Sequence, residues 1–130
     1  MGNEFLDKNK ENEDVVCTES GLQFRVLKNG KGKSPKAKDK VVVHYTGKLV
    51  NGREFDSSHK RGTPAGFKVN AVIRGWSEAL QMMNQGAKWE LFIPPELGYG
   101  KKGVPGVIPP DAVLIFEVEL IKIKSSFFGF

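Results

Sequence analysis

One short amphipathic helix, in a chain otherwise patterned as strands, most constrains the fold. From Trp76 to Met83, apolar residues fall at i, i+3, i+4 and i+7, which places them along one face of a helix. Gly86 supplies a natural end to this helix. A helix of about eight residues is unstable alone in water, so it needs a flat apolar surface to pack on. The rest of the chain is therefore expected to form a sheet with one apolar face.

The remaining segments predict that sheet. Residues 41–50 form a β-branched strand, and the Asn51-Gly52 pair that follows is the strongest two-residue signal for a hairpin. Residues 53–55 should then return antiparallel to this strand. Apolar alternation predicts further strands at residues 22–27, 66–70, 87–93 and 113–120. We expect an α+β domain built on an antiparallel sheet.

Composition excludes several classes of protein. The chain has 130 residues, which is room for one domain, and no apolar run approaches the roughly 18–20 residues that a membrane span needs. The first residues are polar and acidic, unlike a secretory signal peptide. One cysteine and two histidines cannot build a disulfide framework or a thiolate–imidazole metal site. We therefore expect no metal and no cofactor.

The positive charge of the chain is unevenly spread. The formal net charge is +5, but residues 1–20 carry six acidic and two basic side chains. Six lysines lie between Lys28 and Lys40, a run that could contact nucleic acid. A solvated loop is the favoured interpretation, because no aromatic side chain is interleaved to stack on bases. Nucleic acid is not an expected partner.

Residues 94–111 form a long segment with five prolines and four glycines that nevertheless carries apolar side chains. Loops of this length are usually functional. Residues 98–103 match the G-x-G-x-x-G pattern of dinucleotide sites. That site needs a helix to begin at once, whereas Val104-Pro105-Gly106 follows, so we do not expect nucleotide binding.

Residues 56–59 (Asp-Ser-Ser-His) contain the residue types of a hydrolase triad. Triads are assembled from separated segments, whereas four neighbours in a polar loop are more typical of a turn stabilised by its own side chains. We therefore expect turn chemistry here.

Aromatic residues are the more informative set, and they come from six separate segments: Tyr45, Phe55, Phe67, Trp76, Tyr99 and Phe116. An ordinary core would explain most such sets. Three features favour a pocket instead. Trp76 stands at the beginning of the helix, Tyr99 lies between two glycines in a loop, and Asp56 adjoins Phe55, where a carboxylate beside apolar residues needs a partner.

These residues and their order resemble the FKBP-type peptidyl-prolyl isomerases, the immunophilins that bind FK506 and rapamycin. The matching segments occur in family order over about residues 20–124: 43–47, 52–58, 72–76, 93–95, 97–100, 108–110 and 114–120. The spacing after Phe67 and residues 18–24 look most like the macrophage-infectivity-potentiator branch.

The resemblance implies a curved antiparallel sheet of about five strands wrapped around one short α-helix. The isomerase domain would occupy residues 21–124, and residues 125–130 would be a C-terminal tail. Residues 1–20 would be a flexible extension or a frayed helix, since Phe5 and Leu6 alone are not expected to anchor it.

The resemblance also implies a pocket between sheet and helix. The expected catalytic residues are Asp56, Ile73, Trp76, Tyr99 and Phe116, and the expected ligand-binding residues are Tyr45, Phe55, Phe67, Val72 and Ile108. Trp76 would form the floor, and Tyr99 and Ile108 would line the rim. The Ile73 N–H and the Tyr99 hydroxyl would donate to the carbonyls that flank the substrate proline.

The implied function is peptidyl-prolyl cis-trans isomerisation of flexible or unfolded polypeptides, assisting folding and inhibited by FK506 or rapamycin. A non-catalytic scaffold that uses the same pocket for macrolides or proteins is the alternative. We expect a monomer in the cytoplasm, or an exported protein if the sequence is a trimmed piece of a longer one.

Cys17 is predicted to be dispensable, because it lies outside the pocket set and has no histidine or aspartate partner at a useful spacing. We expect Cys17→Ser to keep the kcat/KM of the parent protein on Xaa-Pro peptides. Loss of turnover in this variant would contradict a non-covalent mechanism.

Overall fold

The computed structural model describes residues 2–124, and the expected tail at residues 125–130 lies outside the described residues. The helices are α1 (Gly2–Asn9), α2 (Ser58–Arg61) and α3 (Arg74–Met82). The strands are β1 (Val15–Cys17), β2 (Gln23–Lys28), β3 (Lys40–Leu49), β4 (Glu54–Ser57), β5 (Ala65–Lys68), β6 (Lys88–Ile93) and β7 (Leu114–Lys124). Two single 3₁₀ turns, η1 (Val69–Ala71) and η2 (Pro95–Leu97), complete the order. No helix in this part of the chain is long and apolar enough to span a membrane.

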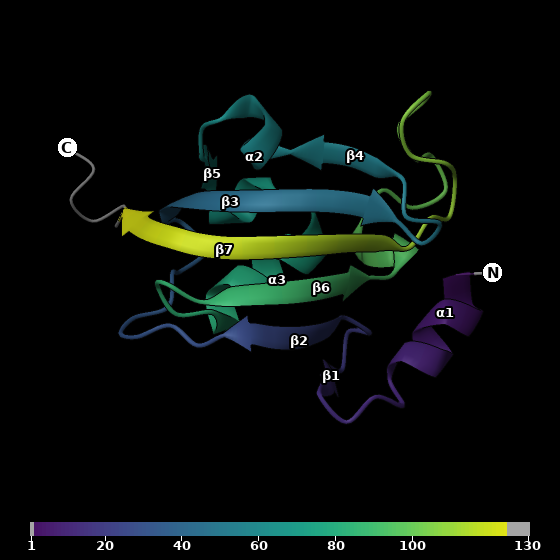
Figure 1. Ribbon diagram of the computed structural model, residues 1–130, viewed down its shortest axis with the longest axis horizontal. Helices are drawn as coiled ribbons and strands as arrows, with labels where there is room; N and C mark the ends of the chain where they lie inside the picture. Colours follow the sequence, from purple (N-terminus) through teal and green to yellow (C-terminus); the bar gives the residue numbers. More distant parts are fainter. Residues whose placement is uncertain (1, 125–130) are drawn as a thin grey trace.

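All strands join one antiparallel sheet in the order β1-β2-β6-β7-β3-β4, with β5 also paired to β3 (Figure 1). The long strands β3 and β7 lie at its centre and pair from Lys40↔Lys124 to Leu49↔Leu114. The expected fold class is confirmed. The count of about five strands was too low, because β1 has three residues and leaves too short an alternation to detect.

Helix α3 lies across one face of the sheet, behind it in Figure 1. Its Trp76, Ala79 and Leu80 are buried in the main core together with residues of β3, β6 and β7. At its first turn the backbone comes very close to β6, since a Cβ on Gly75 would lie 2.8 Å from Ile93 Cγ2. The amphipathic stripe therefore predicted the packing face correctly, and glycine permits the close approach.

The expectation of one helix was also incomplete. Among residues 2–124 there are two further α-helices, and α2 is a single turn whose polar sequence, Ser-His-Lys-Arg, carries no apolar period. The sequence marks α2 by the residues at its two ends instead. The Ser57 side chain accepts a hydrogen bond from the Lys60 N–H, and Gly62 ends the turn with φ of 75°.

The expectation that Phe5 and Leu6 would not anchor the N-terminal segment was wrong. Leu6 is 8% exposed and packs in a second apolar cluster with Phe92, Val113 and Ile115, on the sheet face opposite α3. The Leu6 carbonyl also accepts a hydrogen bond of 3.0 Å from the Gln23 side chain. The outer face of β6 and β7 is apolar at this end, so Leu6, together with Phe5 packed on Phe92 at 6.1 Å between ring centroids, docks α1.

Leu6→Ala should therefore destabilise the whole domain by about 2–5 kcal/mol, as expected for a buried leucine that leaves a cavity. Urea denaturation followed by tryptophan fluorescence measures the change. Val16→Ala is the matched control, because Val16 is 49% exposed and should change the free energy of unfolding by less than about 0.5 kcal/mol. Equal effects of the two substitutions would contradict the docking of α1.

Candidate functional site

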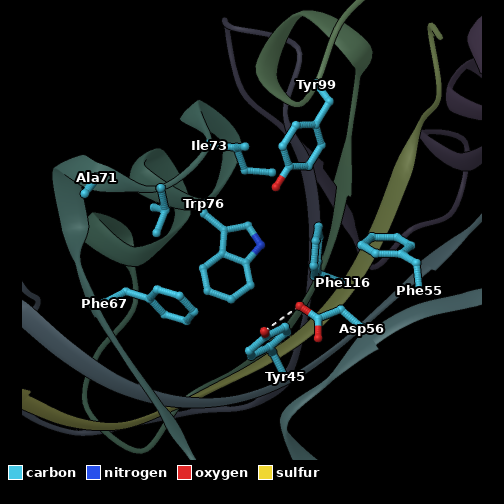
Figure 2. Close-up of a pocket in the computed structure, with 10 residues that line it drawn as sticks. Tyr45, Phe55, Asp56, Phe67, Ala71, Ile73, Trp76, Tyr99 and Phe116 are labelled. Atoms are coloured by element: carbon cyan, nitrogen blue, oxygen red, sulfur yellow. Dashed lines mark hydrogen bonds between the residues drawn. The ribbon is translucent and has the colours of Figure 1, made fainter. Parts of the chain in front are cut away.

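A cavity of about 450 Å³ lies between α3 and the sheet. Figure 2 shows the side chains around it. They come from β3, β4, β5, η1, α3 and β7 and from the segments between them. The lining residues are Tyr45, Phe55, Asp56, Phe67, Ala71, Val72, Ile73, Trp76, Tyr99 and Phe116. Nine of the ten expected site residues are among them, and Ala71 is an addition that no chemical signal marks in the sequence.

Register across the central strands places the aromatic walls. Phe116 on β7 lies opposite Gly47 on β3, and Phe55 follows on β4. A Cβ on Gly47 would lie 2.6 Å from the Phe116 ring and 2.8 Å from the Phe55 ring. Glycine at this position therefore gives both rings the space they occupy, and the rings meet at 5.5 Å and 90°.

The Trp76 indole stands at the centre of the cavity wall and fixes the surrounding rings. It makes edge contacts with Tyr45 at 5.1 Å, Phe67 at 5.5 Å and Phe116 at 5.2 Å between ring centroids. Such edge-to-face geometry is favourable because the positive ring edge meets the negative ring face. Trp76 is only 4% exposed, and its Nε1–H has no hydrogen-bond partner within residues 2–124. The result is a rigid, apolar surface with one unused donor.

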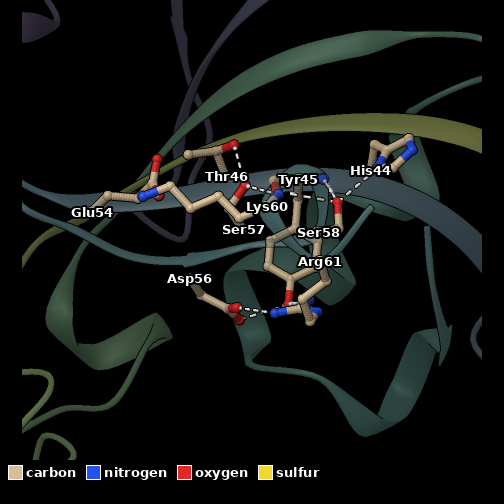
Figure 3. A network of polar contacts seen from close by, with 9 residues as sticks. All are labelled: His44, Tyr45, Thr46, Glu54, Asp56, Ser57, Ser58, Lys60 and Arg61. Atoms are coloured by element: carbon tan, nitrogen blue, oxygen red, sulfur yellow. Dashed lines mark hydrogen bonds and ion pairs between the residues drawn. The ribbon is translucent and has the colours of Figure 1, made fainter. Parts of the chain in front are cut away.

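Asp56 is the single carboxylate in the lining, and it is held by two donors. The Tyr45 hydroxyl donates to Asp56 Oδ2 at 2.6 Å, and Arg61 Nη1 donates to Asp56 Oδ1 at 2.6 Å (Figure 3). Arg61 Nη2 also donates to the Tyr45 hydroxyl at 2.9 Å. The three side chains thus close a ring of hydrogen bonds at the edge of the cavity.

This ring determines the charge state of the site. Burial by itself raises the pKa of Asp56, but the hydrogen bonds from Tyr45 and Arg61 outweigh it and hold that pKa below its ordinary value. Burial, together with the bond to Asp56, raises the pKa of Tyr45. Asp56 is therefore an ionised acceptor at neutral pH and not a proton donor.

Sequence reasoning missed Arg61. The position of Asp56 beside Phe55 did signal that a partner was needed, but Arg61 reaches it only because α2 turns the chain back over β4. The guanidinium also lies 5.6 Å from the centroid of the Tyr45 ring. Predicting the single turn of α2 from its serine cap would have located this residue.

The two serines after Asp56 both stabilise backbone: Ser57 caps its own turn, as expected, whereas Ser58 bonds the backbone of Tyr45 on β3, which was not expected. Ser58 is fully buried, accepts a hydrogen bond of 2.8 Å from the Tyr45 N–H and donates one of 3.3 Å to the Tyr45 carbonyl. Its hydroxyl also lies 2.8 Å from His44 Nδ1, and the His44 ring stacks on His59 at 4.4 Å. This geometry ties α2 to β3 and leaves Ser58 no path to a substrate.

Tyr99 and Ile108 have different positions, although both come from the long loop. Tyr99 is 41% exposed, and its hydroxyl points toward the cavity from the mouth (Figure 2). Ile108 is 5% exposed and does not line the cavity. The expected rim position of Ile108 is therefore not the one observed, because a bridge between Val104 and Ile108 turns this side chain into the core.

Two sequence families match this chain. Residues 31–121 match the family described as FKBP-type peptidyl-prolyl cis-trans isomerase, and residues 1–26 match the domain amino terminal to FKBP-type peptidyl-prolyl isomerase. The second match covers α1, β1 and part of β2, the region in which α1 docks on the sheet.

Several known proteins and solved structures match nearly the whole of this chain. The FKBP-type 22 kDa peptidyl-prolyl cis-trans isomerase of Escherichia coli is 56% identical over 94% of this chain and 59% of its own length. Outer membrane protein MIP of Legionella longbeachae is 46% identical over 96% of this chain and 54% of its own length. The crystal structure of FkpA from Escherichia coli superposes with a TM-score of 0.92 at 46% identity, covering 96% of this chain and 58% of that one. The chain thus spans somewhat more than half the length of these relatives.

The ring of hydrogen bonds predicts that Arg61→Gln raises the pKa of Asp56, because burial remains while a charged donor is lost. The pKa is measured by NMR titration of the Asp56 carboxyl carbon. Lys60→Gln is the matched control, because it removes one positive charge at the neighbouring residue. Lys60 pairs with Glu54 at 2.6 Å and not with Asp56, so the Asp56 pKa should not change. An unchanged pKa in Arg61→Gln would contradict the assigned cause.

The lowered pKa of Asp56 also makes the stability of the folded protein depend on pH. A carboxyl whose pKa is lowered by folding stabilises the folded state above its unfolded pKa of about 3.9, and this contribution is lost as the pH falls through the folded pKa. Arg61→Gln should therefore lose less stability than the parent protein on acidification below about pH 4.

Proposed function

The chain belongs to the FKBP-type peptidyl-prolyl cis-trans isomerase family, and we propose that it catalyses rotation about Xaa-Pro bonds in flexible or unfolded polypeptides. The observation that carries this proposal is the apolar cavity with Trp76 as its floor and aromatic rings as its walls. A pyrrolidine ring is apolar and compact, and it matches such a surface in both size and polarity.

The cavity suits isomerisation because the reaction makes and breaks no covalent bond. Rotation about Xaa-Pro is slow because amide resonance must be lost, at a cost of about 18–20 kcal/mol. In the twisted transition state the carbonyl is less polarised and needs water less than in the planar ground state. An apolar surface that excludes water therefore binds the transition state better than the ground state.

Three polar groups at the edge of the cavity would hold the substrate. The Ile73 N–H, directly before the first turn of α3, would donate to a substrate carbonyl, and the Ile73 carbonyl accepts a hydrogen bond from the Ser77 N–H. The Tyr99 hydroxyl would donate to the other flanking carbonyl. Asp56, ionised and held by Tyr45 and Arg61, would orient the rotating amide by its charge.

Ligands, assembly and location follow from the same family membership as proposals. FK506 and rapamycin should compete with substrate for the cavity. The protein should act as a monomer, because Phe5 and Leu6 of α1 pack on their own sheet. Export is favoured over a cytoplasmic location, since one relative is named an outer membrane protein.

The test is kcat/KM on Xaa-Pro peptides across pH 5–9, with and without rapamycin, for the parent protein and Asp56→Val. We expect a flat profile in this range for both, because Asp56 titrates below it, and a loss of about two- to tenfold in Asp56→Val. Melting temperatures show that the variant is folded, and Asp56→Asn separates charge from shape.

Two results would count against the proposal. A bell-shaped profile, or complete loss of activity in a folded Asp56→Val protein, would mean that Asp56 transfers a proton. Tight rapamycin binding without any turnover would favour the scaffold alternative.

A further inference from the structure

The cavity that Trp76 and the aromatic rings line is called the prolyl cavity below. A second cleft, of about 470 Å³, lies between the β3–β4 hairpin and the long loop. It is lined by Arg53, Lys102, Pro105, Gly106, Val107, Ile108, Pro109 and Pro110. We call it the flanking cleft. Its lining is mostly apolar. The two charged side chains in it are Arg53 from the hairpin and Lys102 from the long loop, and no carboxylate is among its described lining residues.

The two cations are not neutralised by this protein. Both side chains are exposed, and neither forms an ion pair with any of residues 2–124. Two acidic residues lie next to lining residues of this cleft in the sequence, but neither pairs with Arg53 or Lys102. Glu54 pairs with Lys60 at 2.6 Å, and Asp111 lines a different cavity. Lys101, next to Lys102, adds a third exposed positive charge. The flanking cleft is therefore a positive site that lacks an anion.

The two segments that supply these cations also supply residues to the cavity between α3 and the sheet. Arg53 stands two residues before Phe55, and Lys102 stands three residues after Tyr99 in a turn closed by a Gly103 N–H to Tyr99 carbonyl bond of 3.1 Å. Phe55 and Tyr99 both line the prolyl cavity. A client with its proline in that cavity would therefore have its neighbouring residues near the segments that carry Arg53 and Lys102, and an extended polypeptide advances about 3.3 Å per residue.

We propose that the flanking cleft is a specificity subsite for an acidic side chain, aspartate or glutamate, near the isomerised proline. The apolar floor contacts the methylene groups of that side chain, while Arg53 and Lys102 bind its carboxylate. This inference rests on the proposed function, since it concerns the clients of the same enzyme. It predicts a preference for acidic Xaa-Pro segments that is local to the cleft and separate from the net charge of +5.

The experiment compares peptides that differ only by Glu or Gln at the second or third position on either side of the proline. Isomerisation is measured by NMR exchange spectroscopy, because a coupled protease would itself respond to charge. Peptide affinity is measured in parallel by fluorescence anisotropy. The proteins are the parent chain, Arg53→Gln with Lys102→Gln, and a control pair, Lys122→Gln with Lys124→Gln, which removes equal charge at the far end of β7.

At low ionic strength the parent should favour Glu over Gln at one of these positions by about two- to tenfold in kcat/KM and in affinity, as expected for two partly exposed ion pairs. The ratio should fall toward one in about 1 M salt, where the screening length is about 3 Å. It should also fall toward one in the Arg53/Lys102 variant and stay at the parental value in the Lys122/Lys124 control.

The outcomes separate the two proposals. A Glu-to-Gln ratio near one in the parent, or a ratio that falls equally in both variants, overturns the subsite while leaving isomerisation intact. If neither the neutral nor the acidic peptides are turned over, the proposed isomerase function fails. The affinity ratio then still decides whether the flanking cleft binds acidic residues.

Discussion

The packing of Trp76 against three aromatic rings of the sheet is the contact on which the rest of the structure depends. It joins α3 to β3, β5 and β7 at one point, and the same indole lines the cavity between α3 and the sheet. Core and site are therefore not separate regions of this protein. The walls formed by Tyr45, Trp76 and Phe116 are also core, so moving any of these three would cost packing energy in the domain.

A polar ring inside this apolar setting is the second constraint. Asp56 is partly removed from water, which disfavours its charge, and the hydrogen bonds from Tyr45 and Arg61 more than offset this and lower its pKa. Arg61 depends in turn on α2, and α2 depends on the Ser57 cap and on Ser58 bonded to the Tyr45 backbone. A short polar segment that looked like a plain turn therefore maintains the charge at the site.

The sequence predicted most of the sheet because alternation and the Asn51-Gly52 hairpin are local signals. Nine of the ten residues that line the cavity were predicted: the six aromatic residues and Asp56 from their positions in the sequence, and Val72 and Ile73 from the family resemblance alone. What the sequence missed depended on contacts between distant segments. Arg61 meets Asp56 through one turn of helix, Leu6 docks on an outer face whose apolar end was not visible, and Ile108 turns inward through a bridge to Val104. None of these has a periodic pattern.

The position of β7 has a consequence for how this domain comes into being. β7 lies between β6 and β3 at the centre of the sheet, and it pairs residues 40–49 with residues 114–124. Until β7 has left the ribosome, the sheet is in two parts. One part holds β2 paired with β6, the other holds β3 paired with β4, and each has an open edge where β7 will pair. Such long-range pairing makes folding slow and nearly all-or-none. A protein proposed to assist the folding of other chains thus passes through an unprotected stage of its own.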